Sequence, residues 1–239
     1  MKLTINDIKE IISKKNNKYS IVISGLCSNS KYVKKNDLFF ALSGENFNGN
    51  NFINEVIAKG ASCIISDQKQ TSEHHIPIIQ VDDVRLIMSE ISSYFYGNPS
   101  HKLNMIGITG TNGKTSIAEI TGYLLNANDK KANTLGTLGF NNGKKYQTTG
   151  FTTPEPILIN QILSSALEES VQYMVMEVTS HSIEFKRTNH VKLDIGVFSN
   201  LTEEHLDFHK NINNYFLSKL KMFQMMDEKS FSIINIDDS

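Results

Sequence analysis

Residues 105–115 read Met-Ile-Gly-Ile-Thr-Gly-Thr-Asn-Gly-Lys-Thr, an apolar run that passes into a glycine-rich loop and a Lys-Thr pair. The run has the pattern of a buried strand, and the residues after it have the pattern of a helix. A loop in this place lets backbone N–H groups curl around phosphate oxygens, and the helix N-terminus adds partial positive charge. Lys114 is then placed to meet the β- and γ-phosphates, and the Thr115 hydroxyl to bind Mg²⁺. The stretch predicts a nucleotide site formed by Gly110, Thr111, Asn112, Gly113, Lys114, Thr115 and Ser116.

The loop departs from the strict pattern G-x-x-x-x-G-K-[ST], because Ile108 stands where that pattern has glycine. Glycines lie at 107 and 110 instead. The alternative interpretation is a glycine-rich turn between a strand and a helix. Gly113-Lys114-Thr115 at the helix start favours the nucleotide site. The loop by itself does not say what the phosphate is used for.

Outward from this loop the chain alternates between strand and helix patterns. We expect strands over 37–42, 62–66, 76–81, 103–109, 173–178, 193–199 and 231–236, and helices over 52–59, 84–95, 116–126, 155–170 and 213–226. Gly97, Asn98 and Pro99 coincide at a predicted linker over 96–100. The alternation predicts an α/β protein with an N-terminal α/β domain over 1–98. A mostly parallel, P-loop ATPase-type sheet with helices on both faces is predicted over 99–239.

The composition is that of a globular protein, with 39% hydrophobic and 21% charged residues among 239. A formal net charge of -1 argues against a general nucleic-acid binder. Cys27 and Cys63 are too few for a disulfide framework and have no metal-type spacing. The N-terminus turns polar too soon for a secretory signal, and no apolar run is long enough to span a bilayer. We therefore expect a cytoplasmic protein without a membrane partner.

Four motifs follow one another in the second half of the chain: Gly110-Thr111-Asn112-Gly113-Lys114-Thr115, Thr152-Thr153-Pro154-Glu155, Met176-Glu177-Val178-Thr179-Ser180-His181, and Asn200-Leu201-Thr202-Glu203-Glu204-His205-Leu206-Asp207-Phe208-His209. This series closely resembles the Mur ligases, in particular those that add the third residue of the peptidoglycan stem peptide. Asn29-Ser30-Lys31, Asn36-Asp37-Leu38-Phe39 and Ile234-Asn235-Ile236-Asp237-Asp238 extend the resemblance over the whole chain.

The resemblance implies an ATP-dependent ligase with a UDP-MurNAc-binding first domain and a central ATP-binding domain. ATP would phosphorylate the D-Glu carboxylate of UDP-MurNAc-L-Ala-D-Glu, and a diamino acid (meso-diaminopimelate or L-lysine) would displace the phosphate. Cations and positioning should carry most of this chemistry. The resemblance indicates no nucleic-acid partner, and the sequence carries no signal for the oligomeric state or for the diamino acid.

Three further residues have roles implied by the resemblance. Glu177 ends an apolar strand, at the position where open α/β sheets bind ligands. The resemblance implies that it is a Mg²⁺ ligand. The alternative is an exposed acid at a strand end. His205 would bind a second Mg²⁺, although a capping or packing role is open. A zinc site on His205 and His209 lacks a suitable third ligand, and His181 is interpreted as structural. Lys219 would be carbamylated and bind magnesium, whereas spacing alone makes it one more lysine on an amphipathic helix. Together with Lys114 these residues form the predicted catalytic set.

Other positions match substrate contacts of the family: Ser28, Ser30, Glu45, Asn46, Phe47, Thr152, Thr153, Thr179 and Arg187. Ordinary turn chemistry is the alternative for each. The Arg187 guanidinium can clamp a phosphate or carboxylate with two hydrogen bonds. Phe151 replaces the family's Asn and Phe185 its Gln, and each change removes a hydrogen-bonding group from the expected substrate site. Thr179 stands for Ser, Glu204 for Asp and Lys31 for Arg.

Mur ligases have three domains, so the resemblance implies that the chain stops inside the central domain and lacks the C-terminal ligase domain. We expect such a chain to be inactive or nearly so, with an unpaired sheet edge and exposed apolar surface. Two alternatives remain open at this point: a folylpolyglutamate-type ligase with a similar loop, and a non-catalytic remnant that binds a nucleotide or UDP-sugar.

Overall fold

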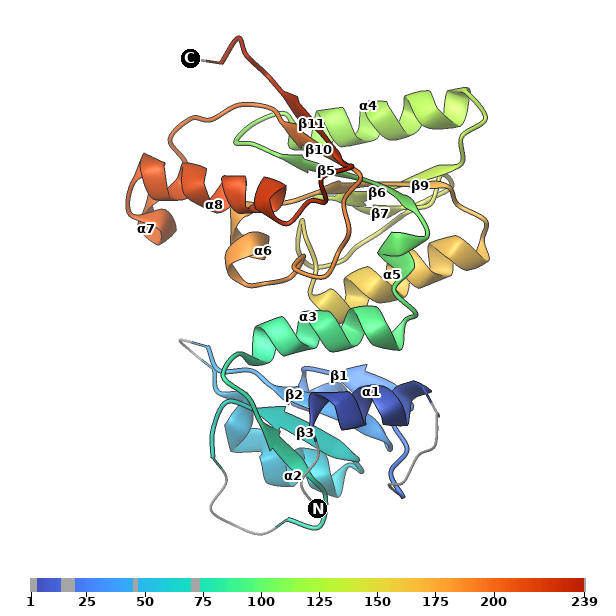
Figure 1. Cartoon of the computed structure of the whole chain (residues 1–239), viewed down its shortest axis with the longest axis vertical. Helices are drawn as coiled ribbons and strands as arrows, with labels where there is room; N and C mark the ends of the chain where they lie inside the picture. The colour runs from blue at the N-terminus through green and yellow to red at the C-terminus, as the bar shows by residue number, and fades with distance from the viewer. Residues whose placement is uncertain (1–3, 14–19, 45–46, 70–73, 239) are drawn as a thin grey trace. The chain divides into compact units, whose positions relative to one another are not determined.

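The computed structural model describes residues 4–13, 20–44, 47–69 and 74–238 (Figure 1). The chain divides into two compact units, Met1–Phe95 and Tyr96–Ser239. The division falls at the start of the predicted linker over 96–100, just before the predicted boundary after residue 98. The whole of that linker belongs to the second unit: η3 (Pro99–His101) begins there, and the Ser100 Oγ accepts a hydrogen bond of 3.1 Å from the Lys192 N–H.

The first unit contains a four-stranded parallel sheet in the order β1-β2-β3-β4. Its elements are α1 (Ile5–Ser13), β1 (Gly25–Cys27), η1 (Ser30–Tyr32), β2 (Asp37–Ala41), η2 (Gly49–Phe52), α2 (Ile53–Ala58), β3 (Cys63–Ser66), β4 (Ile78–Gln80) and α3 (Val84–Phe95). Every residue of β2 and β3 is buried, as expected for central parallel strands that are covered on both faces. Phe39 and Ile64 of these strands pack with Ile53 and Val56 of α2.

The second unit contains a seven-stranded sheet in the order β11-β10-β5-β9-β6-β7-β8. Its strands are β5 (Asn104–Thr109), β6 (Ala132–Gly136), β7 (Gly139–Asn141), β8 (Tyr146–Gln147), β9 (Tyr173–Glu177), β10 (Ile195–Phe198) and β11 (Phe231–Ile234). Its helices are α4 (Lys114–Ala127), α5 (Pro156–Glu168), α6 (Ser180–Glu184), α7 (Leu206–His209) and α8 (Ile212–Gln224). The pairs β6–β7 and β7–β8 are antiparallel, and the other strand pairs are parallel.

Successive side chains of the central strands point to opposite faces of this sheet, and each face has its own hydrophobic core. Met105, Met174 and Met176 point to one face and pack in a core with residues of α5 and α8. Ile106, Ile108 and Val175 point to the other and pack with Ala118 of α4. Figure 1 shows α4 on one side of the sheet and α5 on the opposite side. The predicted fold, a mostly parallel sheet with helices on both faces, is confirmed.

The sequence prediction was wrong or silent at a few elements. The helix that was expected over 155–170 spans Pro156–Glu168, with Glu155 as its N-cap; a proline at the first helical position has no N–H to leave unpaired. The antiparallel extension β7–β8 and the short elements α1, β1, β6, α6 and α7 were not predicted. These are brief segments, so local periodicity carries little signal for them.

The sequence led us to expect a sheet edge with exposed apolar side chains. Strand β11 forms one edge of the seven-stranded sheet. Phe231 is 72% exposed, and Ile233 and Ile234 are 55% and 59% exposed. A mainly apolar hollow of about 440 Å³ lies beside this strand, and Phe216 and Phe223 of α8 line part of it. Among the described helices, none combines the length and the apolar character that crossing a membrane requires.

Candidate functional site

The loop over 110–113 joins β5 to α4 at the carboxyl end of β5, an interior strand of the sheet. It is held by the segment that follows β10, the neighbouring strand. The N–H of Thr111 donates to the Asn200 carbonyl at 2.9 Å, and that of Asn112 to the Asn200 Oδ1 at 2.8 Å. The Ser199 hydroxyl donates to the Asn112 carbonyl at 2.7 Å. The predicted phosphate loop is thus held by these three hydrogen-bonding groups of a distant segment, which the loop motif alone does not reveal.

Glycine is required at position 110 for two reasons. Its φ of +139° is a backbone conformation that residues with a side chain rarely adopt. A Cβ atom there would also lie 2.0 Å from the Ser199 Oγ. The glycine that matters sterically is therefore Gly110, and not the position 108 where the strict motif has one.

Two amines converge on the carbonyl oxygen of Gly110. Lys114 at the start of α4 donates to it at 2.9 Å, and also to the Thr111 carbonyl at 2.6 Å. Lys219 of α8, which is 1% exposed, donates to it at 2.7 Å. The Lys114 and Lys219 amines are thereby neighbours at the loop.

Burial is the main cause that lowers the pKa of both amines. For Lys219 the pKa falls to about 7, through burial and the nearby Lys114 charge, with Glu204 acting in the opposite direction. The pKa of Lys114 is also lowered by burial, while the carboxylates of Glu204 and Glu177 raise it. The Lys219 amine also lies over the Tyr215 ring, 4.1 Å from its centroid. Near neutral pH a large fraction of Lys219 is therefore an uncharged amine.

Lys219→Met should change the pH dependence of stability. Between about pH 7 and the ordinary lysine pKa of about 10.5, the unfolded chain binds a proton at Lys219 that the folded chain does not, so stability of the wild type rises with pH. The variant lacks this contribution and is expected to gain most in melting temperature at pH 6–7, with the gain shrinking towards pH 10. Thermal melts in CO₂-free buffer test this. The exposed Lys229→Met is the control, and an equal shift for Lys219→Met at every pH would contradict the assignment.

Glu177 ends β9, the strand on the other side of β5 from β10, and is 1% exposed. The alternative of an exposed strand-end acid is therefore wrong. The Thr137 N–H donates to its Oε1 at 2.8 Å and the Thr137 hydroxyl to its Oε2 at 3.2 Å. Its charge acts on Lys114. Glu177 and the loop that leads to Lys114 thus lie at the carboxyl ends of adjacent strands, where ligands of open α/β sheets bind.

The three histidines of the motifs form one aromatic cluster with Phe208. The His181 ring lies against the rings of Phe208, His205 and His209, with centroid distances of 4.4, 4.7 and 5.7 Å. His209 is buried and its Nε2 lies 2.9 Å from the Ser180 Oγ, whereas His205 is exposed. Burial lowers the pKa of His181 and of His209. Among the described residues no group of three or more His, Cys, Asp or Glu side chains is arranged to hold a metal ion.

The segment over 151–155 packs against the end of β9 and against Arg187. The Thr153 hydroxyl donates to the Glu177 carbonyl at 2.8 Å, and the Thr179 N–H donates to the Thr153 hydroxyl at 3.2 Å. Arg187 donates to the Thr153 carbonyl at 3.0 Å and pairs with Glu155 at 2.9 Å. The four predicted substrate residues Thr152, Thr153, Thr179 and Arg187 are thus brought together next to Glu177.

The two phenylalanines that depart from the family pattern both contact Arg187. Its guanidinium lies 4.3 Å from the Phe151 ring centroid and 5.6 Å from that of Phe185. A cation over an aromatic face is attracted by the ring quadrupole. The hydrogen-bonding groups that the substitutions remove are therefore exchanged for aromatic contacts with a buried cation.

In the first unit, Ser28 and Ser30 follow β1, and Phe47 follows β2. Because these strands are adjacent and parallel, the residues lie at the same edge of the four-stranded sheet. Ser30 is buried, and Phe47 is 52% exposed and stacks on Phe52 with ring centroids 5.0 Å apart. The remaining predicted residues, Glu45 and Asn46, lie outside the described residues.

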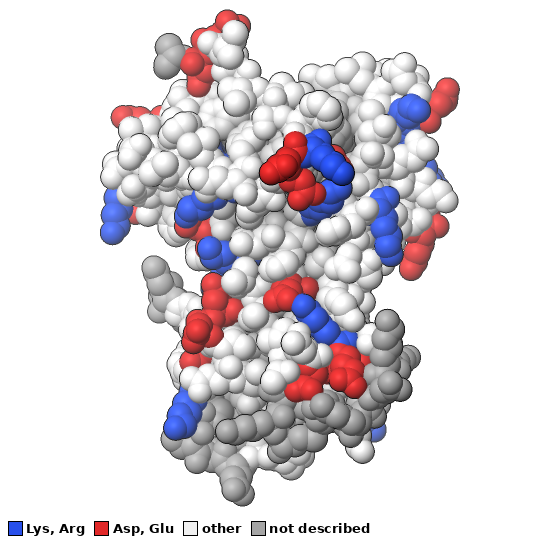
Figure 2. Space-filling view, viewed as in Figure 1, with Lys and Arg blue, Asp and Glu red and all other residues white. Residues whose placement is uncertain are grey.

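Residues that sequence reasoning missed complete the site: Ser199, Asn200, Thr137, Tyr215 and Glu204. The Tyr215 hydroxyl donates to Glu204 at 3.4 Å, and Glu204 acts on both lysines. The signal for Thr137 was the pair of glycines at 136 and 139, which suggests a tight turn. On the face drawn in Figure 2, acidic and basic side chains are interspersed among uncharged surface, without a broad basic area over the described residues.

Comparison with known proteins agrees with this arrangement. Residues 108–239 match the family model of the Mur ligase middle domain, and residues 22–96 match the model described as Mur ligase family, catalytic domain. A curated relative from Caldanaerobacter subterraneus subsp. tengcongensis, named UDP-N-acetylmuramoyl-L-alanyl-D-glutamate--2,6-diaminopimelate ligase, is 38% identical over 219 residues, which are 92% of this chain and 45% of the relative. A relative of the same name (numbered 1) from Clostridium acetobutylicum is 36% identical over 100% of this chain and 48% of its own length.

Solved structures show the same fold. A UDP-N-acetylmuramoyl-L-alanyl-D-glutamate--2,6-diaminopimelate ligase has a TM-score of 0.80 at 22% identity, over 100% of this chain and 48% of that one. MurF ligase from Thermotoga maritima, solved in complex with ADP, has a TM-score of 0.62 at 23% identity, over 89% of this chain and 46% of its own. The chain spans about half the length of the curated relatives it matches.

Proposed function

This chain belongs to the Mur ligase family, and on that premise we propose that its protein adds a diamino acid to UDP-MurNAc-L-Ala-D-Glu at the expense of ATP. The residues present here would bind the nucleotide and the UDP-sugar peptide. The names of the curated relatives specify 2,6-diaminopimelate, which favours that diamino acid over lysine. Because ATP and UDP-sugars are cytoplasmic metabolites, we also infer a cytoplasmic location.

One observation carries this proposal: Lys114 and Lys219 converge on the Gly110 carbonyl, within electrostatic reach of acidic side chains. A turn that served only to join a strand to a helix would have no need of two amines whose pKa values are lowered by burial. Burying a charged group is costly unless a partner compensates it. A bound triphosphate would supply that partner for Lys114.

In the proposed reaction the D-Glu carboxylate oxygen attacks the γ-phosphorus of ATP, and the bond to the β-phosphate oxygen breaks. ADP leaves, and an acyl phosphate remains. The amine of the diamino acid then attacks the acyl carbon, loses a proton and expels inorganic phosphate. Lys114 and the N–H groups at the start of α4 would stabilise the charge on the transferred phosphoryl group. Thr152, Thr153, Thr179 and Arg187 would hold the peptide beside Glu177.

Carboxylate and hydroxyl oxygens are the ligand types that suit magnesium, which usually completes its coordination with water and substrate phosphates. Each oxygen of Glu177 accepts one hydrogen bond from Thr137 and keeps a lone pair for a metal ion. Thr115 stands in the first turn of α4, and His205 is exposed near Glu204. We assign Glu177 and Thr115 to one Mg²⁺ and His205 to a second. Bound Mg²⁺ would neutralise charge on the phosphate oxygens.

Lys219 would complete the second site as a carbamate. Its neutral amine adds to CO₂ and releases a proton, which converts a buried cation into an anion that can bind a metal ion. The lowered pKa of Lys219, about 7, supports this role because only the uncharged amine reacts. ¹³C NMR of the chain in ¹³C-bicarbonate should show a carbamate carbon that Lys219→Met lacks; an identical signal in both proteins would refute the assignment.

Calorimetric titration of the chain with Mg-ATP, and separately with UDP-MurNAc-L-Ala-D-Glu, tests the proposed function. UDP-N-acetylglucosamine, which carries no peptide, is the control ligand. Binding of both substrates, with the control clearly weaker, is the expected result. Binding of the nucleotide alone would point to a folylpolyglutamate-type ligase, and binding of neither would overturn the proposal.

A further inference from the structure

Thr137 lies in the turn between β6 and β7 and gives both of its hydrogen-bond donors to Glu177. The N–H reaches Oε1 at 2.8 Å and the hydroxyl reaches Oε2 at 3.2 Å. The carboxylate is 1% exposed, whereas Thr137 itself is exposed. Because each carboxylate oxygen accepts from a different donor of Thr137, this residue fixes the rotation of the Glu177 carboxylate about the Cγ–Cδ bond.

The turn reaches Glu177 because of strand register and two glycines. β6 runs parallel to β9 with Leu135 opposite Met176, so both strands end at the same level. A Cβ atom on Gly136 would lie 2.1 Å from the Glu177 Oε1, so only glycine lets the turn approach the carboxylate. Gly139, at φ +98°, closes the tight turn back into β7.

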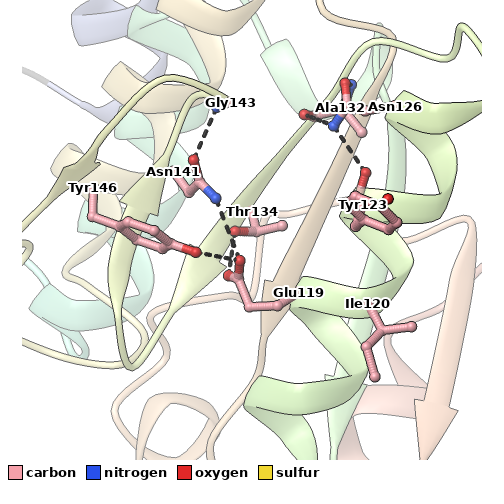
Figure 3. Close-up of a pocket in the computed structure, with 10 residues that line it drawn as sticks. Glu119, Ile120, Tyr123, Asn126, Ala132, Thr134, Asn141, Gly143 and Tyr146 are labelled. Atoms are coloured by element: carbon pink, nitrogen blue, oxygen red, sulfur yellow. Dashed lines mark hydrogen bonds between the residues drawn. The ribbon is translucent and has the colours of Figure 1, made fainter.

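The hairpin that carries this turn is fastened to α4, the helix of the phosphate loop. Figure 3 shows the Glu119 side chain of α4 pointing to Thr134, Asn141 and Tyr146 on three successive strands. Its carboxylate accepts from the Thr134 hydroxyl at 2.5 Å, the Tyr146 hydroxyl at 2.6 Å and the Asn141 amide at 3.3 Å. These contacts lie at a hollow of about 560 Å³, which Tyr123 also lines. The position of Thr137 is thus fixed relative to the loop.

Thr137 also contacts the segment that carries the predicted substrate residues. Its Oγ1 lies 3.2 Å from the Thr152 Oγ1. A hydroxyl has one proton, and that of Thr137 is directed to Glu177, so Thr152 is the donor of this second hydrogen bond. The hydroxyls of Thr152 and Thr137 therefore form a chain that ends on the Glu177 carboxylate.

We infer that Thr137 is a positioning residue, which orients the Glu177 carboxylate for a divalent cation and couples that carboxylate to the Thr152 segment. This inference rests on the proposed function, since it takes Glu177 as a metal ligand. Hydrogen bonds to a ligating carboxylate fix its orientation, and losing such a partner typically costs about 10–100-fold in metal affinity. A residue that only closes a turn would affect stability and leave the affinity for the cation unchanged.

Thr137→Val tests the inference, because valine keeps the size and the N–H and removes the hydroxyl. The readout is the Mg²⁺ concentration that gives half-maximal binding of a fluorescent ADP analogue to the full chain. We expect this concentration to rise about 10–100-fold in Thr137→Val, and to return to near the wild-type value in Thr137→Ser. Thr148→Val, which changes an exposed threonine just after β8, is the matched control and should behave as wild type. Excess Mg²⁺ should restore binding to Thr137→Val.

A second readout needs neither metal nor nucleotide. Amide hydrogen exchange over 149–153 should quicken in both Thr137→Val and Thr152→Val, and the effects should not add in the double variant, because both remove the same hydrogen bond. If the wild type binds Mg-nucleotide and Thr137→Val needs the same Mg²⁺ concentration for half-maximal binding as the wild type, this inference is overturned and the proposed function stays intact. A wild type that binds no nucleotide overturns both.

Discussion

Replacing Lys114 by methionine is expected to weaken binding of Mg-ATP by about 100-fold. Lys114 is the amine that α4 presents at the phosphate loop, and its donors now rest on the carbonyls of Gly110 and Thr111 at 2.9 and 2.6 Å. A phosphate oxygen is a stronger acceptor for an ammonium group than a carbonyl. Hydrogen bonds between charged groups contribute about 1.5–3 kcal/mol, which corresponds to roughly 10–150-fold in affinity.

The control for this experiment is Lys130→Met, which removes an exposed lysine just beyond the end of the same helix. Calorimetry gives the affinities, and a thermal melt of each variant shows that the fold is retained. Because burial lowers the pKa of Lys114, its replacement by an apolar side chain should not lower stability greatly. A Lys114→Met protein that binds Mg-ATP within about twofold of wild type would remove the loop from the proposed site.

Gly110→Ala is expected to lower the free energy of unfolding by about 3–5 kcal/mol. The backbone strain at a positive φ contributes about 1–3 kcal/mol, and forced displacement of packed atoms about 1–3 kcal/mol more. The new Cβ would lie 2.0 Å from the Ser199 Oγ and 3.1 Å from the Asn200 carbonyl O. Those atoms hold the loop through Asn112 and Thr111, so the variant should lose nucleotide binding as well.

Gly143→Ala is a matched control for this substitution. Gly143 also has a positive φ, +78°, but nothing lies within 4 Å of the position of its Cβ. It should therefore show the strain alone, with a loss of about 1–2 kcal/mol and unchanged nucleotide binding. Urea denaturation measures both stabilities. Equal losses for the two variants would mean that close approach of Ser199 and Asn200 does not constrain the loop.

The two proposed Mg²⁺ sites and the substrate segment share one structural cause. β9 and β10 flank β5, so the segments after all three strands meet at the carboxyl edge of the sheet. Glu177 ends β9, Ser199 and Asn200 follow β10, and the phosphate loop follows β5. Residues far apart in sequence are therefore close in space without any local motif that joins them.

The sequence by itself determined the α/β class, the strand–loop–helix unit over 103–126, and the candidate residues Lys114 and Glu177. These depend on side-chain periodicity and on short motifs, which are properties of neighbouring residues and can be read along the chain. The resemblance to the Mur ligases added the roles of Glu177, His205 and Lys219, which spacing alone left open.

Only the tertiary structure decided how these groups meet. Lys114 and Lys219 belong to two different helices and meet at one carbonyl oxygen. Thr137 lies in the turn after β6, and it contacts Glu177 at the end of the neighbouring strand β9. The aromatic contacts of Phe151 and Phe185 with Arg187 are equally non-local. Burial, pKa and hydrogen-bond partners depend on which elements pack together, and a linear pattern does not contain that information.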